Sequence, residues 1–185
     1  MASRRFWTIA VLALCGLPAT AAWTLAANEP STHAQTDEGK HVFRKANCFG
    51  CHKWHGGGGG GYGGAALSLR DTQLDRDQII EVVSCGRPGT GMPAHEREAY
   101  ADGHCYGLKE KDLGDGMPPK AATPLRRSEI ESVADYVIRS IKGRGEVTYA
   151  ECKSFWGEES KMCNSYVAAT PSSSEGMEGS SGPKP

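Results

Sequence analysis

The sequence lacks an excess of charge of either sign. Its 185 residues include 21 lysines and arginines against 22 aspartates and glutamates, which gives a formal charge of −1 at pH 7. The sequence has neither the basic excess typical of nucleic-acid binding nor a block of acidic residues, so we expect no nucleic-acid partner. The length is that of one ordinary domain.

The chain also lacks any clear β-strand pattern and any internal repeat, and the periodicity that it has is helical. Helices are predicted to begin at Thr36 and to span residues 75 to 84 and 128 to 141. The last of these carries its apolar residues on a single stripe: Ile130, Val133, Ala134, Val137, Ile138 and Ile141. We therefore predict an all-α fold.

Local signals mark where these helices begin. Asp75 with Gln78, and Ser128 with Glu131, have the spacing of capping boxes. The residues between the second and last helices, 86 to 127, are rich in glycine and proline. They predict a long irregular connection with one turn of helix at 109 to 113.

The first 27 residues contain no acidic side chain. Arg4 and Arg5 precede an apolar run over residues 6 to 14, and small residues at 19 to 21 and at 25 to 27 suit cleavage. This is the layout of a secretory signal, which predicts a periplasmic protein. The alternative is an uncleaved anchor over residues 6 to 27, and only that alternative would attach the protein to a membrane.

The remaining sequence divides by composition. Residues 28 to 35 form a polar lead-in, 36 to 142 a domain, 143 to 167 an extension with two cysteines, and 168 to 185 a Ser/Gly/Pro tail that we expect to be disordered. Removal of residues 1 to 27 leaves 19 basic against 22 acidic residues, a formal charge of −3. It also leaves six cysteines, an even number suited to an oxidising compartment.

Cys48, Cys51 and His52 form a Cys-x-x-Cys-His motif, the signature of covalent c-type haem attachment. Two thiols three residues apart can form thioethers along one porphyrin edge, and the adjacent imidazole then becomes the proximal iron ligand. A redox dithiol or half of a zinc site is the alternative. A zinc site would need a second matched pair, which the sequence lacks.

With this motif in view, the chain resembles a class I c-type cytochrome. The matching features are Gly39, Phe43, CFGCH, the Gly-x-Gly-Met-Pro segment at 89 to 93 and Tyr136. The resemblance covers residues 36 to 142 and implies a small cytochrome c fold. It also implies that the first and last helices cross, with Gly39 admitting Tyr136. An enlarged ligand-loop connection and the C-terminal extension depart from the family pattern.

Two further departures surround the motif. Residues 56 to 61 are six consecutive glycines, for which the sequence suggests only a backbone that other groups can approach closely. In that family a proline usually follows the motif, and its carbonyl receives the proximal imidazole proton; here this proline is replaced near Ala65. We expect a carbonyl there to orient His52.

The resemblance implies a methionine as the sixth iron ligand. Met92 follows the second helix in Gly-Thr-Gly-Met-Pro, and Met117 precedes the last helix in Gly-Met-Pro-Pro. We predict Met92, with Met117 as the alternative, and for either residue a core-filling role is the structural alternative. His95 or His104 would instead give a bis-histidine iron.

For the remaining residues near the motif, the sequence predicts roles less specifically. Trp54, Tyr62 and Arg87 are predicted to surround the haem propionates, and ordinary packing is their alternative.

The four remaining cysteines allow three pairings. The local pairing, Cys85 with Cys105 and Cys152 with Cys163, is predicted over a second metal site.

These expectations describe a one-electron carrier with a single haem c. An iron held by His52 and a methionine has no open position for substrate, so we expect no enzymatic activity. Expected partners are an exported dehydrogenase, such as a quinoprotein, as donor and another cytochrome or an oxidase as acceptor. They would dock near Phe49 and Gly50. Because the chain without residues 1 to 27 is negatively charged, electrostatic steering favours partners with a basic patch. The alternative is a ligand-binding or peroxidase-like haem protein with an open distal site.

Overall fold

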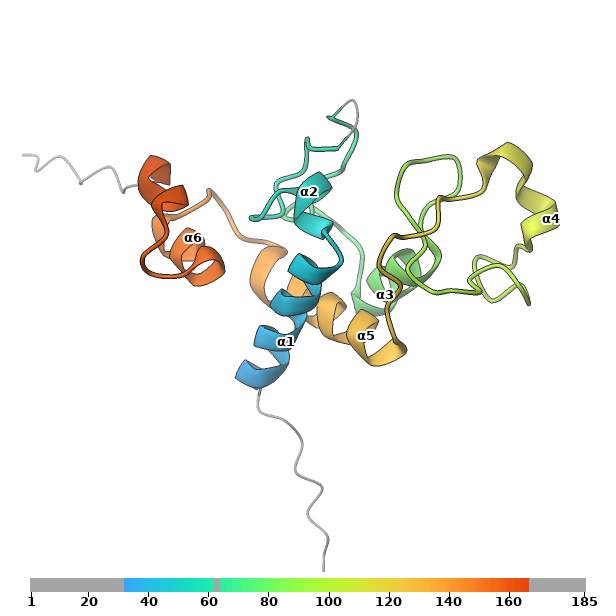
Figure 1. Cartoon of the computed structure of the whole chain (residues 1–185), viewed down its shortest axis with the longest axis horizontal. Helices are drawn as coiled ribbons and strands as arrows, with labels where there is room; N and C mark the ends of the chain where they lie inside the picture. The colour runs from blue at the N-terminus through green and yellow to red at the C-terminus, as the bar shows by residue number, and fades with distance from the viewer. Residues whose placement is uncertain (1–31, 62–63, 167–185) are drawn as a thin grey trace, which may run out of the picture.

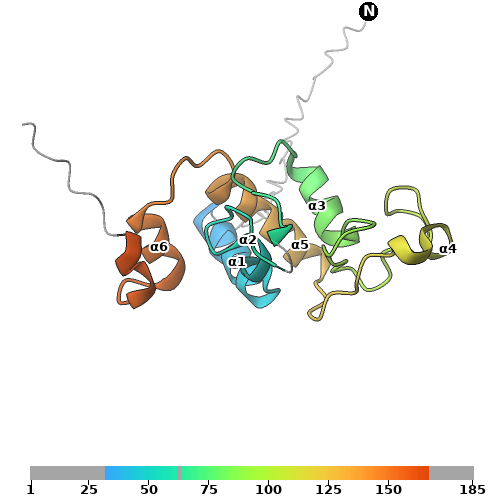
Figure 2. The ribbon, with the colours of Figure 1, turned by 90° about the horizontal axis from the view of Figure 1, so that it is seen from above.

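A computed structural model describes residues 32–61 and 64–166, and this part of the chain is helical without a β-strand. The predicted all-α class is confirmed. The elements lie in a row from α6 through α1 and α5 to α3 and α4 (Figures 1 and 2). Their bounds are α1 (Thr32–Lys45), α2 (Cys48–His52), α3 (Arg76–Cys85), α4 (Glu110–Leu113), η2 (Gly114–Gly116), α5 (Arg127–Tyr136), η3 (Val137–Ile141), α6 (Tyr149–Trp156) and η4 (Lys161–Tyr166).

The centre of the fold is the crossing of α1 and α5, which occurs at Gly39. A Cβ placed on this glycine would lie 2.1 Å from the Ser132 carbonyl oxygen and 2.6 Å from the Tyr136 Cβ. The Phe43 and Tyr136 rings then meet edge to face with centroids 5.6 Å apart. The crossing expected from the family resemblance is therefore present, and it buries the apolar stripe of α5.

Helix α3 packs against α5 and begins as predicted. The Asp75 carboxylate accepts a hydrogen bond from the Gln78 backbone at 2.9 Å, and the Gln78 side chain accepts one from the Asp75 backbone at 2.9 Å. Ile79, Ile80 and Val83 are buried in the main core. The predicted helical turn near residue 109 is α4.

Two helix starts differ from the predictions. Helix α1 begins at Thr32, so Thr36 lies inside it and the last residues of the polar lead-in are helical. Helix α5 begins at Arg127, and the backbone of Arg126 donates to Glu129 Oε2 at 2.9 Å. The predicted Ser128 pair with Glu131 was wrong, because the N-cap lies two residues earlier, at Arg126, and its free amide is satisfied by Glu129.

The long connection between α3 and α5 has a small core of its own. Cys85 bonds to Cys105, and with Ala94, Ala99 and Tyr100 they form a second buried cluster. Ala94 pairs with Lys120 in an isolated parallel bridge, which joins the two halves of the connection. Cys152 bonds to Cys163 in the extension, so the structure contains both predicted disulfides.

Several predicted segments lie outside the described residues: the signal segment, the first half of the polar lead-in, Tyr62 and the C-terminal tail. Within 32–61 and 64–166, no helix has the length and apolar character needed to cross a bilayer.

A buried carboxylate links the two crossed helices. Glu129 on α5 is only 6% exposed and accepts from the Lys45 ammonium of α1 at 2.5 Å. These contacts, with Lys45 first and the Arg126 backbone next, lower the pKa of Glu129 from 4.5 to about 2. Because the pKa is lower in the folded state, the stabilisation is present above about pH 4.5 and is lost as the pH falls toward 2.

We therefore expect Glu129→Gln to lower the unfolding midpoint at pH 7, and the difference from the parent protein to shrink between pH 4.5 and 2. Denaturant unfolding followed by circular dichroism at a series of pH values measures this. Glu131→Gln is the matched control, because Glu131 pairs with Arg127 on the exposed side of the same helix at 2.7 Å. A difference for Glu129→Gln that stays constant down to pH 2 would contradict the expectation.

Candidate functional site

The Cys-x-x-Cys-His motif forms the short helix α2 directly after α1. Asn47, which separates them, has left-handed backbone angles (φ 57°, ψ 30°), and asparagine tolerates these better than most residues. Lys53 ends the motif with φ 61°. Within α2, Cys48 and Cys51 are i and i+3 neighbours and lie on one side of the helix.

The thiols of Cys48 and Cys51 are free, whereas the other four cysteines of the described residues form disulfides. Cys48 is partly buried against the main core, and Cys51 is exposed. Burial, with the charge of Cys51 as a smaller cause, raises the pKa of the Cys48 thiol to about 12. The two neighbouring thiols are thus not joined to each other, and both are available for covalent attachment.

The ring of His52 is held through one nitrogen. Its Nδ1 lies 2.8 Å from the Leu67 carbonyl oxygen, so Nδ1 carries the proton and Nε2 keeps a free lone pair. Burial lowers the pKa of His52, which favours the neutral, ligating form. The expected orienting carbonyl exists, but it belongs to Leu67 and lies two residues beyond the predicted position at Ala65.

The glycine run folds back onto the motif. Gly60 donates to the Cys51 carbonyl at 3.0 Å, and a Cβ on Gly60 would lie 2.4 Å from that oxygen. Gly58 donates to the His52 carbonyl, has φ +69°, and would place a Cβ 2.6 Å from the Ala66 carbonyl. The close approach that the sequence suggested is therefore present at these positions, and the structure identifies the approaching groups as the Cys51 and Ala66 backbone.

The two candidate methionines lie on neighbouring loops. The Gly89 amide donates to the Gly116 carbonyl at 2.8 Å, so the segments leading to Met92 and Met117 run beside one another. Both methionines are partly buried. Met117 packs against the second buried cluster around Cys85 and Cys105, whereas Met92 belongs to neither core cluster.

Arg87 and Trp54 lie in different surroundings. The positive charge of Arg87 contributes to the lowered pKa of His52, which places the guanidinium near the imidazole. Trp54 packs against the extension, with ring centroids 5.9 Å from Phe155 and 5.3 Å from Tyr166.

The two competing histidines are engaged elsewhere. His95 is buried, and its Nδ1 lies 3.1 Å from the Thr123 carbonyl. His104 contacts Asp102 and Glu96 beside the Cys85–Cys105 disulfide.

Residues 34–105 match the family model described as cytochrome C oxidase, cbb3-type, subunit III. The match contains α1 from its third residue, the CFGCH motif, α3 and the Met92 segment. The chain carries a class I c-type cytochrome domain. Searches of curated proteins and of solved structures each found no match. The cytochrome binds haem c covalently and transfers electrons through it.

The residues around CFGCH fit this cofactor. Two unpaired thiols lie on one side of α2, and the imidazole next to them has a lone pair on Nε2. Glycine backbone, without side chains, lies against Cys51. The haem supplies a single-electron change between ferric and ferrous iron, and the chain supplies attachment, an oriented imidazole and partial exclusion of water.

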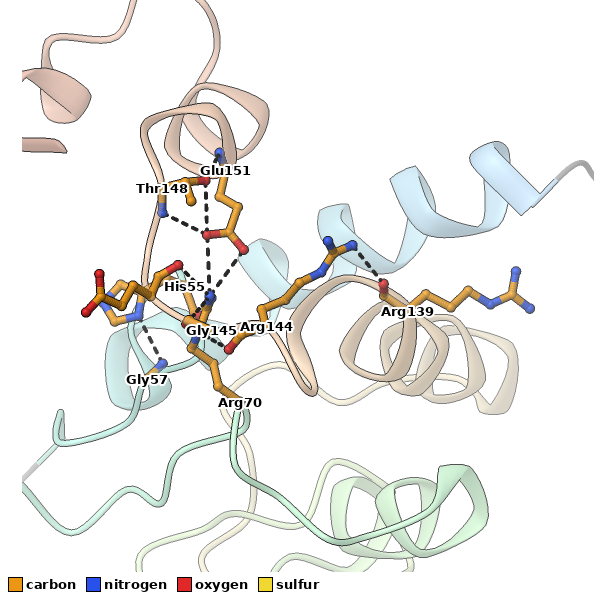
Figure 3. A network of polar contacts seen from close by, with 9 residues as sticks. His55, Gly57, Arg70, Arg139, Arg144, Gly145, Thr148 and Glu151 are labelled. Atoms are coloured by element: carbon orange, nitrogen blue, oxygen red, sulfur yellow. Dashed lines mark hydrogen bonds and ion pairs between the residues drawn. The ribbon is translucent and has the colours of Figure 1, made fainter. Parts of the chain in front are cut away.

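Sequence reasoning missed how the extension is joined to the domain. Arg70 is 8% exposed, and its guanidinium donates to the carbonyls of His55, Arg144, Gly145 and Glu146 and to the Glu151 carboxylate (Figure 3). This places α6 against the motif, where Trp156 lies 5.9 Å from Phe49 between ring centroids. Phe49 is partly covered as a result, while Gly50 and Cys51 are exposed.

Proposed function

We propose that this cytochrome is a periplasmic one-electron carrier with one haem c, attached through Cys48 and Cys51 and ligated by His52 and Met92. The observation that carries the proposal is the His52 ring, held through Nδ1 by Leu67 with Nε2 free beside two unpaired thiols. Iron held by both His52 and Met92 would have no position left for a substrate. We therefore propose that the protein has no enzymatic activity of its own.

The choice of Met92 over Met117 is supported by packing and by the extent of the family match. Met117 contributes to the small core of the connection, where its removal would cost packing. Met92 lies in the matched segment, which ends before Met117. Its approach is shaped by Gly89, whose φ of +72° favours glycine, and by Thr90, whose hydroxyl accepts from the Met92 amide at 3.2 Å.

We expect Met92→Ala to abolish the near-infrared methionine-to-iron band of the oxidised protein and to lower its reduction potential, since a thioether favours ferrous iron. The matched variant Met117→Ala should keep the band and lose stability by about 1 kcal/mol, because Met117 is partly buried against the second cluster. Absorption spectra and potentiometric titration of both variants measure these effects. Loss of the band in Met117→Ala alone would overturn the assignment of Met92.

Partners are proposed from chemistry. We infer an exported dehydrogenase, such as a quinoprotein, as electron donor and another cytochrome or an oxidase as acceptor. Approach at the exposed Gly50 and Cys51 would bring a partner closest to the attachment segment. The net charge of −3 without residues 1 to 27 favours partners with a basic patch.

The first experiment is an absorption spectrum of the purified protein, oxidised and reduced, with and without carbon monoxide. A carrier should be low-spin in both states and should not bind carbon monoxide. A high-spin reduced spectrum that shifts with carbon monoxide would instead support a ligand-binding or peroxidase-like protein. Colour that is lost on denaturation and extraction would argue against thioether attachment.

A further inference from the structure

The glycine run forms an exposed surface beside Cys51 that consists almost entirely of backbone. We call Gly50, Cys51 and Gly59 to Gly61 the glycine face, and all of them except the partly buried Gly60 are exposed. The Gly60 amide donates to the Cys51 carbonyl at 3.0 Å, and a Cβ on Gly61 would lie 3.2 Å from Cys51 Sγ. A side chain at Gly61 would therefore cover the sulfur that attaches the haem, whereas glycine leaves this sulfur open.

Steric need does not explain every glycine of this face. A Cβ on Gly59 would meet only the flexible end of a side chain, the Lys53 ammonium, at 3.4 Å. The backbone of Gly59 has φ +70°, a value that asparagine also adopts. A bare backbone at Gly59 is thus not required by the fold of the loop. It allows another protein surface to approach the attachment sulfur, and electron transfer slows steeply as the distance between two redox centres grows.

The charge around the motif is opposite in sign to the net charge of the chain. From Gly39 to Arg70 the sequence holds five basic residues and no acidic residue. Three of the five pair with carboxylates from outside this stretch: Lys40 with Asp37, Lys45 with Glu129 and Arg70 with Glu151. The other two, Arg44 and Lys53, form no ion pair within residues 32–61 and 64–166.

These two unpaired cations lie on either side of the motif. Lys53 is exposed, follows His52 directly and has its ammonium beside Gly59. Arg44 is also exposed, and its guanidinium lies over the ring of Trp156, 5.4 Å from the centroid, on the side of Phe49. A protein that approaches the glycine face therefore meets positive charge.

Most of the negative charge lies in another part of the molecule. Residues 71 to 116 hold ten acidic and five basic residues, a formal charge of −5. This segment contains α3 and α4, at the right of Figure 1, whereas α2 lies near the centre. Because salt screens exposed charges beyond about 8 to 10 Å, the nearest charges decide which surface is attracted to the glycine face.

We propose that the glycine face is the docking surface for a redox partner that presents a flat, acidic patch, with Lys53 as the main charged contact. The proposal rests on the carrier function and names the chemistry of the partner at that site. When the partner accepts the electron, the cytochrome is oxidised from ferrous to ferric and the one-electron centre of the partner is reduced. A partner with a basic patch, which the net charge favours, would be repelled at this face.

Film voltammetry of the haem-loaded protein on gold tests the proposal, with carboxylate-terminated and ammonium-terminated monolayers of equal length as flat acidic and basic surfaces. At low salt, electron exchange should be about 10-fold faster or more on the carboxylate monolayer, and the difference should shrink as salt is added. Lys53→Glu should slow exchange on the carboxylate monolayer about 10-fold. Lys111→Glu is the matched control, because Lys111 is exposed on α4 among the acidic residues. Its rate should stay within about 2-fold of the parent rate.

A second pair of variants tests the absence of side chains. Gly59→Asn should slow exchange on the carboxylate monolayer severalfold and leave the unfolding midpoint unchanged, because asparagine suits the backbone there. Gly107→Asn is the matched control: this glycine of the long connection is exposed, has φ +72°, and a Cβ there would meet nothing within 4 Å. Its exchange rate should equal that of the parent protein.

Faster exchange on the ammonium monolayer, or equal rates for Lys53→Glu and the parent protein, would overturn the acidic partner. An unchanged rate for Gly59→Asn would overturn the role of the bare backbone. Soluble mediators should reduce and reoxidise every variant completely. A parent protein that cycles with mediators but exchanges electrons with neither monolayer would overturn the docking face alone, whereas failure to cycle with mediators would contradict the carrier function.

Discussion

Gly39→Val is expected to destabilise this cytochrome by more than about 3 kcal/mol, enough to leave much of a marginally stable domain unfolded. Even the first carbon of the new side chain would lie 2.1 Å from the Ser132 carbonyl oxygen, which belongs to the backbone of α5. A backbone carbonyl cannot move aside as a flexible side chain can. The two helices would have to separate, and Phe43 and Tyr136 would lose their edge-to-face contact.

Denaturant unfolding of the haem-loaded protein, followed by far-ultraviolet circular dichroism, measures this loss. Gly145→Ala is the matched control, since a Cβ there meets nothing within 4 Å and the carbonyl that accepts from Arg70 is retained. Its stability should stay within about 0.5 kcal/mol of the parent protein. A Gly39→Val protein as stable as this control would show that the helices do not cross here.

Arg70→Met is expected to release the C-terminal extension and to cost about 3 kcal/mol or more. The guanidinium satisfies the carbonyls of Arg144 and Gly145 at 3.1 and 2.9 Å through Nε alone, and a methionine of similar length can satisfy neither. Each such hydrogen bond contributes about 0.5 to 1.5 kcal/mol, and the buried Arg70 guanidinium makes several of them. We therefore expect faster proteolysis between the domain and α6, with Trp156 becoming more exposed to fluorescence quenchers.

Arg76→Met is the matched control. Arg76 also makes a two-point contact, with Asp135 at 2.8 and 3.2 Å, but its side chain is 43% exposed and the pair should contribute about 1 kcal/mol or less. Arg70→Lys keeps the positive charge but loses the several N–H donors of the planar guanidinium. It should therefore be more stable than Arg70→Met but less stable than the parent protein. Equal effects of the two methionine variants would mean that Arg70 does not hold the extension.

Local signals in the sequence were sufficient for much of the fold. The Asp75 capping box, the apolar stripe after residue 127 and the Cys-x-x-Cys-His motif each act over a few residues, and the structure contains all three elements. The start of α5 was mispredicted because Glu129 and Glu131 both suit a capping position. Only the path of the chain before Arg127 selects Glu129.

The glycine run shows the limit of local reading most clearly. Six glycines predict backbone freedom, but their use depends on the Cys51 and Ala66 carbonyls that they approach. The same holds for the carbonyl on His52, which was expected near Ala65 and belongs to Leu67, two residues farther along the chain. Both depend on the length of the loop that follows the motif before it folds back onto α2, and tertiary packing determines that length.

The sequence alone indicated the all-α class, the attachment motif and the local disulfide pairing, because each depends on spacing along the chain. The glycine at the helix crossing followed from the resemblance to class I c-type cytochromes. Tertiary structure was needed to join the extension to the domain through Arg70, to distinguish the surroundings of Met92 and Met117, and to bring Gly59 and Gly61 against Lys53 and Cys51. These are contacts between residues far apart or in irregular segments. Such contacts are favourable only when buried polar groups meet at the correct distance and angle. The order of residues along the chain has no periodic pattern that would predict this.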